Sequence, residues 1–190
     1  GDALQLAPVL NDNIHYGYFF KSEDDLNLVQ FRIDGFTYNR LKPYTNWEQV
    51  FSETMRMWTI YCQVVSPKFI NRLAVRYINQ FQVPLTEHHL SHYLTNPPEI
   101  PSGISKTLSN FLVRLTITDQ KTDISANVTQ SSGNSQATNK IPLIIDIDVF
   151  KQGRFNLQDA QLDQTFNPLR NLKNDIFFGV ITDNTVELFK

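Results

Sequence analysis

One stretch of this sequence, residues 71–83, alternates between apolar and polar side chains along almost its whole length. The apolar set consists of Leu73, Val75, Tyr77, Phe81 and Val83. The polar set between them includes Arg72, Arg76, Gln80 and Gln82. A period of two places the two sets on opposite faces of an extended chain. The stretch therefore predicts a long β-strand with one buried face and one polar face.

Further strands are predicted on both sides of this one. Residues 28–33 and 36–41 flank the dipeptide Asp34-Gly35, which readily forms a two-residue hairpin turn. A second hairpin is predicted from residues 111–118 and 122–129, around the turn 119–121. Strand character is also found in residues 16–21, in the deeply apolar segment 141–150, and in the short segment 185–189.

Apolar residues at steps of three and four predict two long helices. The first, residues 45–65, begins with a capping box from Thr45 to Glu48 and ends before Pro67. Its apolar stripe consists of Trp47, Phe51, Met55, Trp58, Cys62 and Val65. The second covers residues 157–181, and Pro168 inside it predicts a kink or two consecutive helices.

Because the strands come in runs instead of alternating with helices, we expect an α+β fold. It consists of a mainly antiparallel sheet with the two long helices packed on one face, and a short extra helix near 86–94. A chain of 190 residues, 41% of them hydrophobic, is expected to form a single domain over 1–190. Within it we expect residues 1–15 to be irregular and residues 131–139 to form a mobile loop.

Charge and cysteine content exclude several classes of protein. The 17 basic and 19 acidic residues give a net charge of −2, which provides no large positive field for nucleic acid. A single cysteine excludes an internal disulfide and a cysteine-rich zinc site. The sequence has no apolar run long enough to span a membrane, and its first residues lack signal-peptide character, so a cytoplasmic protein is expected.

Five segments in one order resemble a sporadically distributed prokaryotic family of uncharacterised proteins. They read RLKPYTNWE, RLAVRYIN, IDIDVF, LRNLKNDIFF and ITDNTVELF, and the similarity runs from about residue 18 to the end. The resemblance implies a further N-terminal strand rich in Pro, Ile, Val and Glu, which this sequence does not show. It implies no activity or catalytic residue. The patchy distribution of the family suggests a link to defence or mobile elements.

The acidic pair Asp146 and Asp148 is the first candidate for chemistry. Positions i and i+2 of a strand share a face, so the two carboxylates lie about 7 Å apart and could bridge a divalent ion such as Mg²⁺. The alternative is that Arg72 and Arg76 lie on a nearby strand and form ion pairs with both aspartates. We favour the ion pairs, because the four charges neutralise one another and a metal site usually needs a third oxygen ligand. The absence of a glycine-rich phosphate loop further disfavours a nucleotide-processing role.

Other candidates carry weaker signals. His88 and His92 are spaced to share one helical face and bind a metal, but Glu87 precedes them, so the zinc-protease motif is absent. Cys62 lies on the apolar helix stripe, which favours core packing over nucleophilic catalysis. Nucleic-acid binding is disfavoured, although basic and aromatic residues could serve it: Arg32, Arg40, Arg72, Arg76, Arg114, Tyr38, Tyr44 and Tyr77.

A last polar group, Arg170, Lys173 and Asn174, is predicted on the solvated side of the second long helix, from which it could approach the acidic strand. We therefore expect a non-enzymatic binding or protein-interaction module without a cofactor. Its binding face would consist of Arg72, Arg76, Asp146, Asp148, Arg170, Lys173 and Asn174. Two alternatives stay open. One is a metal-dependent phosphoryl-transfer or nucleotide-processing enzyme built on the aspartates. The other is a small-molecule carrier whose long C-terminal helix grips a curved sheet.

Overall fold

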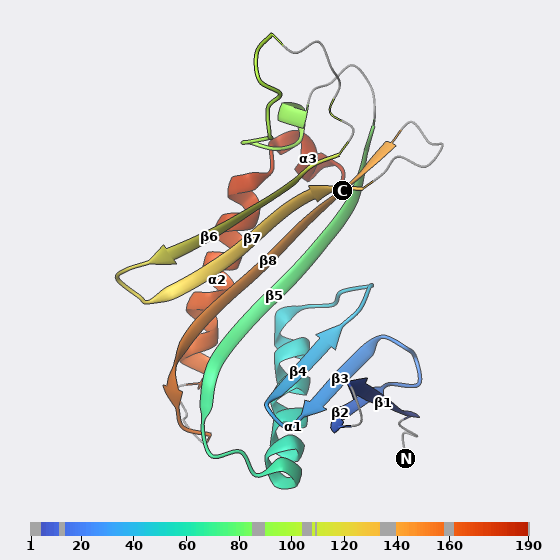
Figure 1. Cartoon of the computed structure of the whole chain (residues 1–190), viewed down its shortest axis with the longest axis vertical. Coiled ribbons are helices and arrows are strands. Elements are labelled where there is room, and N and C mark those ends of the chain that lie inside the picture. Colours follow the sequence, from blue (N-terminus) through green and yellow to red (C-terminus); the bar gives the residue numbers. More distant parts are fainter. Residues whose placement is uncertain are drawn as a thin grey trace. The chain divides into compact units, whose positions relative to one another are not determined.

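A computed structural model describes residues 5–11, 14–84, 90–103, 108, 110–133, 140–157 and 162–189. The chain divides into two compact units, Gly1–Lys68 and Phe69–Lys190, each with its own antiparallel sheet (Figure 1). The predicted α+β class is confirmed, but the strands are shared between two sheets where the sequence predicted one. The expectation of a single domain stays a prediction.

The N-terminal unit is a four-stranded sheet in the order β1-β2-β3-β4 with one helix, α1. The strands are β1 (Gln5–Asn11), β2 (Ile14–Lys21), β3 (Asn27–Arg32) and β4 (Gly35–Arg40), and the helix is Trp47–Val65. Aromatic rings join the two layers: Phe31 and Phe36 of the sheet pack on Trp58 and Tyr61 of the helix, with ring centroids 5.3–5.6 Å apart. The Tyr61 hydroxyl donates to the Arg32 carbonyl at 2.9 Å.

The first unit departs from the sequence predictions at three points. Strand β1 lies within the segment expected to be irregular, and it pairs with β2 along its length. The hairpin loop is Ile33-Asp34, because Arg32 pairs with Gly35; this register places Phe31 opposite Phe36, where both rings reach the helix. The helix is capped by Asn46, whose Oδ1 accepts from the Gln49 amide at 2.9 Å, in place of the predicted Thr45.

The C-terminal unit is a four-stranded sheet in the order β5-β8-β7-β6. Its strands are β5 (Ile70–Pro84), β6 (Leu112–Asp119), β7 (Ile124–Ser132) and β8 (Lys140–Phe155). Helix α2 (Leu162–Val180) packs on β5 and β8. Alternating residues of three strands form the buried face of the sheet, and Leu169 of the helix is buried with them. The buried strand residues are Leu73, Val75, Phe81, Val83, Ile124, Ala126, Val128, Leu143, Ile145, Ile147 and Val149. The predicted alternation of residues 71–83 is confirmed.

The helical segments of this unit also differ from expectation. Pro168 lies inside one continuous helix. Because proline has no amide hydrogen, the carbonyl of Gln164 one turn earlier loses its helical hydrogen bond, and Gln164 is exposed to solvent. The predicted last strand, 185–189, is wrong: Asp183–Glu187 forms the short helix α3, in which the buried Thr185 donates its hydroxyl to the Tyr93 carbonyl at 2.6 Å. The short helix expected near 86–94 is a 3-10 turn, η1 (Leu90–His92), and residues 85–89 lie outside the described residues, as do residues 134–139 of the predicted loop.

Candidate functional site

The two aspartates of β8 are held by the two arginines of β5. Arg72 donates to both oxygens of Asp148 at 2.9 and 2.8 Å. Arg76 contacts Asp146 with two nitrogens, Nε to Oδ1 at 2.8 Å and Nη2 to Oδ2 at 2.6 Å, whereas Arg72 reaches both oxygens of Asp148 from Nη2 alone. The ion pairs favoured from the sequence are therefore present. The hydrogen bond to Asp146 raises the pKa of the Arg76 guanidinium, so the arginine stays charged.

The strand register explains this geometry. Arg76 lies directly opposite Asp148, so its contact with Asp146 is diagonal. Arg72 reaches Asp148 by crossing the ring of Phe150, with its guanidinium carbon 4.4 Å from the ring centroid. Every oxygen of the two carboxylates thus accepts from a guanidinium, and an incoming cation would have to compete with the positive charge of both arginines. Among the described residues no group of three His, Cys, Asp or Glu side chains could hold a metal ion.

Much of this outer sheet face away from the ion pairs consists of polar side chains that bond to one another, although Ile78 and Leu112 are also exposed on it. The Thr116 hydroxyl donates to Oδ1 of Asn127 at 3.0 Å, and the hydroxyls of Thr118 and Ser125 lie 3.0 Å apart. Asn127 also pairs in register with Asp148, so the threonine row continues the ion-pair row across the sheet. The ion-pair row is electrically balanced, and these threonine, serine and asparagine side chains use part of their hydrogen-bonding capacity within the sheet.

Lys173 does not join this polar face. It is only 9% exposed, and its Nζ lies 4.0 Å from the centroid of the Tyr77 ring, on the helix-covered side of the sheet. Burial lowers the pKa of its amine, and the nearby Arg170 lowers it further. The Lys173 Nζ donates to Oδ1 of Asn174. The prediction of a solvated basic face is wrong for Lys173, and the sheet itself separates this lysine from Asp146 and Asp148.

The other residues that the sequence suggested for metal binding, catalysis or nucleic-acid binding do not form a common site, and several make contacts within the fold. His88 lies outside the described residues, and His92 faces Asn184, whose Nδ2 is 3.3 Å from the ring Nδ1. Burial raises the pKa of the Cys62 thiol, which disfavours the thiolate that a nucleophilic role would need. Tyr38 and Arg40 both donate to Oδ1 of Asn27, at 2.8 and 3.1 Å.

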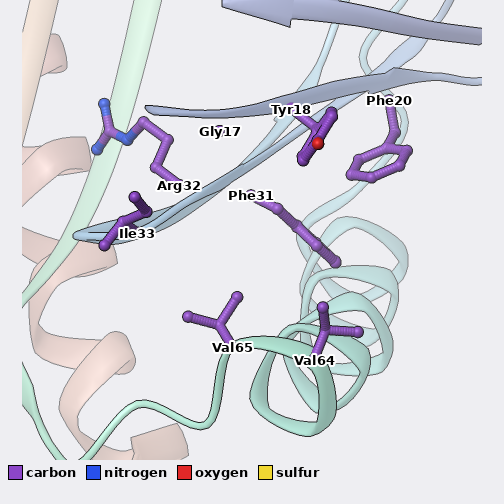
Figure 2. A pocket seen from close by; sticks show the side chains of 8 residues that line it. All are labelled: Gly17, Tyr18, Phe20, Phe31, Arg32, Ile33, Val64 and Val65. Carbon is purple, nitrogen blue, oxygen red and sulfur yellow. The ribbon is translucent and has the colours of Figure 1, made fainter. Parts of the chain in front are cut away.

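An apolar groove in the N-terminal unit was not predicted from the sequence. It has a volume of about 590 Å³. Figure 2 shows Tyr18, Phe20 and Phe31 extending from the sheet toward Val64 and Val65 at the end of α1, while the guanidinium of Arg32 points away. Ile33 stands at one side of the groove. The rim is open to solvent, since Val64 is 71% and Ile33 68% exposed.

The groove exists because α1 packs over the β3 and β4 side of the sheet and leaves β2 uncovered. Gly17 contributes to its shape: a Cβ at this position would lie 2.3 Å from the Phe31 carbonyl oxygen, so only glycine allows β2 and β3 to approach this closely. One signal in the sequence could have indicated the site. Val64 is apolar but lies off the stripe that defines the buried side of the helix.

Comparisons with protein-family models, with curated proteins and with solved structures gave no match. The resemblance described above therefore stays a prediction. None of the described helices is long and apolar enough to cross a membrane.

Proposed function

We propose that this chain is a non-enzymatic binding module that takes apolar side chains of a partner protein into the groove between β2, β3 and the end of α1. The observation that supports this function is an exposed apolar rim, Ile33 and Val64, next to an aromatic floor. Contiguous exposed apolar surface is costly in water and is typical of interaction sites. A cytoplasmic location, as expected from the sequence, is part of the proposal.

The openness of the groove favours a protein partner over a small ligand. Small-molecule sites enclose most of the ligand surface, so their lining residues are largely buried. Here Val64, Ile33 and Tyr18 remain exposed to solvent. The carrier predicted from the sequence also required the C-terminal helix, whereas this groove is formed with α1. A partner that inserts a few apolar or aromatic side chains fits the shape.

The enzyme alternative has less support, because the aspartates that would bind its metal already accept hydrogen bonds from Arg72 and Arg76. A catalytic ion would compete with the two guanidinium groups for these oxygens, and two carboxylates alone supply few of the oxygen ligands that such an ion takes. The ion pairs instead tie the outer strand β5 to the central strand β8 on the face that the helix does not cover.

Affinity purification from the producing cells tests the proposal when three forms of the chain are compared quantitatively. Val64→Lys places an ammonium at the rim of the groove, and Gln63→Lys adds the same charge at the neighbouring exposed position of the helix. We expect at least one protein to be retained by the wild type and by Gln63→Lys and lost from Val64→Lys. If both variants retain the same proteins, the groove is not the binding site.

A further inference from the structure

Strand β6 is an outer strand of its sheet, and its free edge carries exposed apolar side chains. It runs for eight residues in unbroken register with β7 and contains no proline. Outer strand β1 contains Pro8 and a register shift, and outer strand β4 is shorter, at six residues. Outer strand β5 has a register shift near Ile70 and a proline at its end, and the residues between them pair with β8 without interruption. Proteins use such features to prevent edge-to-edge pairing. Figure 1 shows β6 at the margin of its sheet.

At every second residue of β6, the backbone amide and carbonyl groups point away from β7. The Ser132 amide donates to the Phe111 carbonyl at 3.1 Å, which makes this pair a hydrogen-bonded one. Hydrogen-bonded pairs alternate along an antiparallel ladder, so odd-numbered residues of β6 bond to β7. The amide and carbonyl groups of Leu112, Arg114, Thr116 and Thr118 therefore point away from the sheet, and no other strand of the described residues pairs with them.

The side chains of β6 also end an apolar row that is buried on its neighbour. On the helix side, Ala126 and Val128 of β7 are fully buried. Their partners on β6, Ile117 and Leu115, are 44% and 50% exposed. An extended strand added outside β6 would continue this row and shield both side chains, and it would satisfy the outward backbone groups at the same time.

We propose that a second copy of this chain supplies that strand, through antiparallel pairing of β6 with β6 around a two-fold axis at Thr116. This pairing sets Leu115 of each copy opposite Ile117 of the other, so apolar side chains meet on one face. On the other face each Arg114 lies opposite Thr118. A register centred one residue earlier would make the two Arg114 guanidinium groups diagonal neighbours, which repel each other.

The strand is self-complementary, and this property favours a second copy over an unrelated strand. An isologous contact requires that one surface matches itself under two-fold rotation. With the axis at Thr116, the outward amide and carbonyl groups of Arg114 in one copy face those of Thr118 in the other. Leu115 and Ile117 of both copies lie on the helix side. The interface uses a surface different from the apolar groove, so it goes beyond the proposed function.

Sedimentation equilibrium of the full chain tests the pairing. We expect a species of twice the monomer mass for the wild type and a monomer for Thr116→Pro, because proline removes the outward amide at the axis. Thr116→Ala is the matched control: it loses the same hydroxyl bond to Asn127 but keeps the amide, and it should remain dimeric. A monomeric wild type, or a dimeric Thr116→Pro, would overturn the proposal.

Circular dichroism checks that the proline variant is folded, and Ile117→Lys replaces it if it is not. A lysine on the helix side would bring two buried charges into the interface, so this variant should also be monomeric. The register is tested by oxidation of single cysteines in a Cys62→Ala background. Thr116→Cys should form a disulfide between copies more completely than Leu115→Cys. The reverse order would exclude the register centred on Thr116.

Discussion

Both units pack one long helix on a four-stranded sheet, but they do so with different types of side chain. Each has four antiparallel strands and one helix of 19 residues, α1 or α2. The first unit joins sheet to helix through aromatic rings such as Phe31 and Tyr61, and the second through rows of aliphatic side chains such as Ile147. A helix is about 10 Å wide and strands lie about 4.8 Å apart, so one helix covers about two strands.

Each four-stranded sheet is therefore left with apolar side chains that its helix does not cover. In the first unit this excess surrounds the groove beside β2, and in the second it lies along β6. The two proposed interaction surfaces, the groove beside β2 and the edge of β6, therefore have the same cause. Both arise where a single helix is too narrow for the apolar face of its sheet.

The largest expected effect tests the aliphatic core of the second unit. Ile147 is fully buried, so Ile147→Ala should lower the free energy of unfolding by about 3 kcal/mol through lost burial and an unfilled cavity. The matched control is Ile78→Ala on the neighbouring strand β5, where the side chain is largely exposed and the loss should stay below about 0.5 kcal/mol. Denaturant unfolding measures both, and equal losses would contradict the assignment of the two faces.

The second largest change in stability is expected where β2 and β3 approach each other closely in the first unit. Gly17→Ala should destabilise the protein by about 2 kcal/mol, because the added methyl group would collide with the Phe31 backbone. Gly179→Ala is the opposite control: a Cβ there meets nothing within 4 Å, and alanine in a helix should stabilise by about 0.5 kcal/mol. Thermal unfolding followed by circular dichroism would show whether the two shifts have opposite signs.

A smaller effect concerns the buried amine of the second unit, which has no counterpart among the described residues of the first. We expect Lys173→Met to stabilise the protein by about 1 kcal/mol at neutral pH, because methionine fills similar space without a charge. The pKa of Lys173 is lowered by burial, so the unfolded chain binds the proton more tightly than the folded one. Wild-type stability should therefore rise as the pH increases toward the unfolded pKa.

The pH dependence distinguishes this explanation from a simple packing change. The advantage of Lys173→Met should shrink as the pH approaches 10, measured by urea unfolding at several pH values. Lys121→Met, at an exposed turn, provides the control and should change stability little at any pH. An advantage that does not vary with pH would show that the charge of Lys173 is not the cause.

The smallest effect concerns the ion pairs on the outer sheet face. In a double-mutant cycle with Arg76→Met and Asp146→Asn, the coupling energy should be about 0.5 kcal/mol, since the pair is partly exposed. Calorimetric titration of the wild type with Mg²⁺ and Mn²⁺ should show no binding heat. Binding that is lost in folded Asp146→Asn would favour the enzyme alternative and contradict the proposed function.

The sequence predicted the placement of side chains correctly where the relevant geometry was local to one strand, while the binding role of that face stays a prediction. Alternation placed Arg72 and Arg76 on the polar face, and the spacing of Asp146 and Asp148 placed both carboxylates on one face of β8. The sequence did not predict that Lys173 is buried, because a lysine on an amphipathic helix is normally solvated. It also did not predict the groove, whose residues come from three separate segments of the chain.

The sequence by itself determined which side of each strand and helix is apolar. Apolar residues that recur every two positions share one face of a strand, and those that recur every three to four positions share one face of a helix, whatever the rest of the fold. Only the tertiary structure decided how strands are divided between two sheets, that the hairpin loop is Ile33-Asp34, and that residues 183–187 form a helix. These outcomes depend on contacts between distant segments, such as Phe36 with Trp58 and Thr185 with Tyr93. A local pattern specifies which face is buried but not which partner buries it.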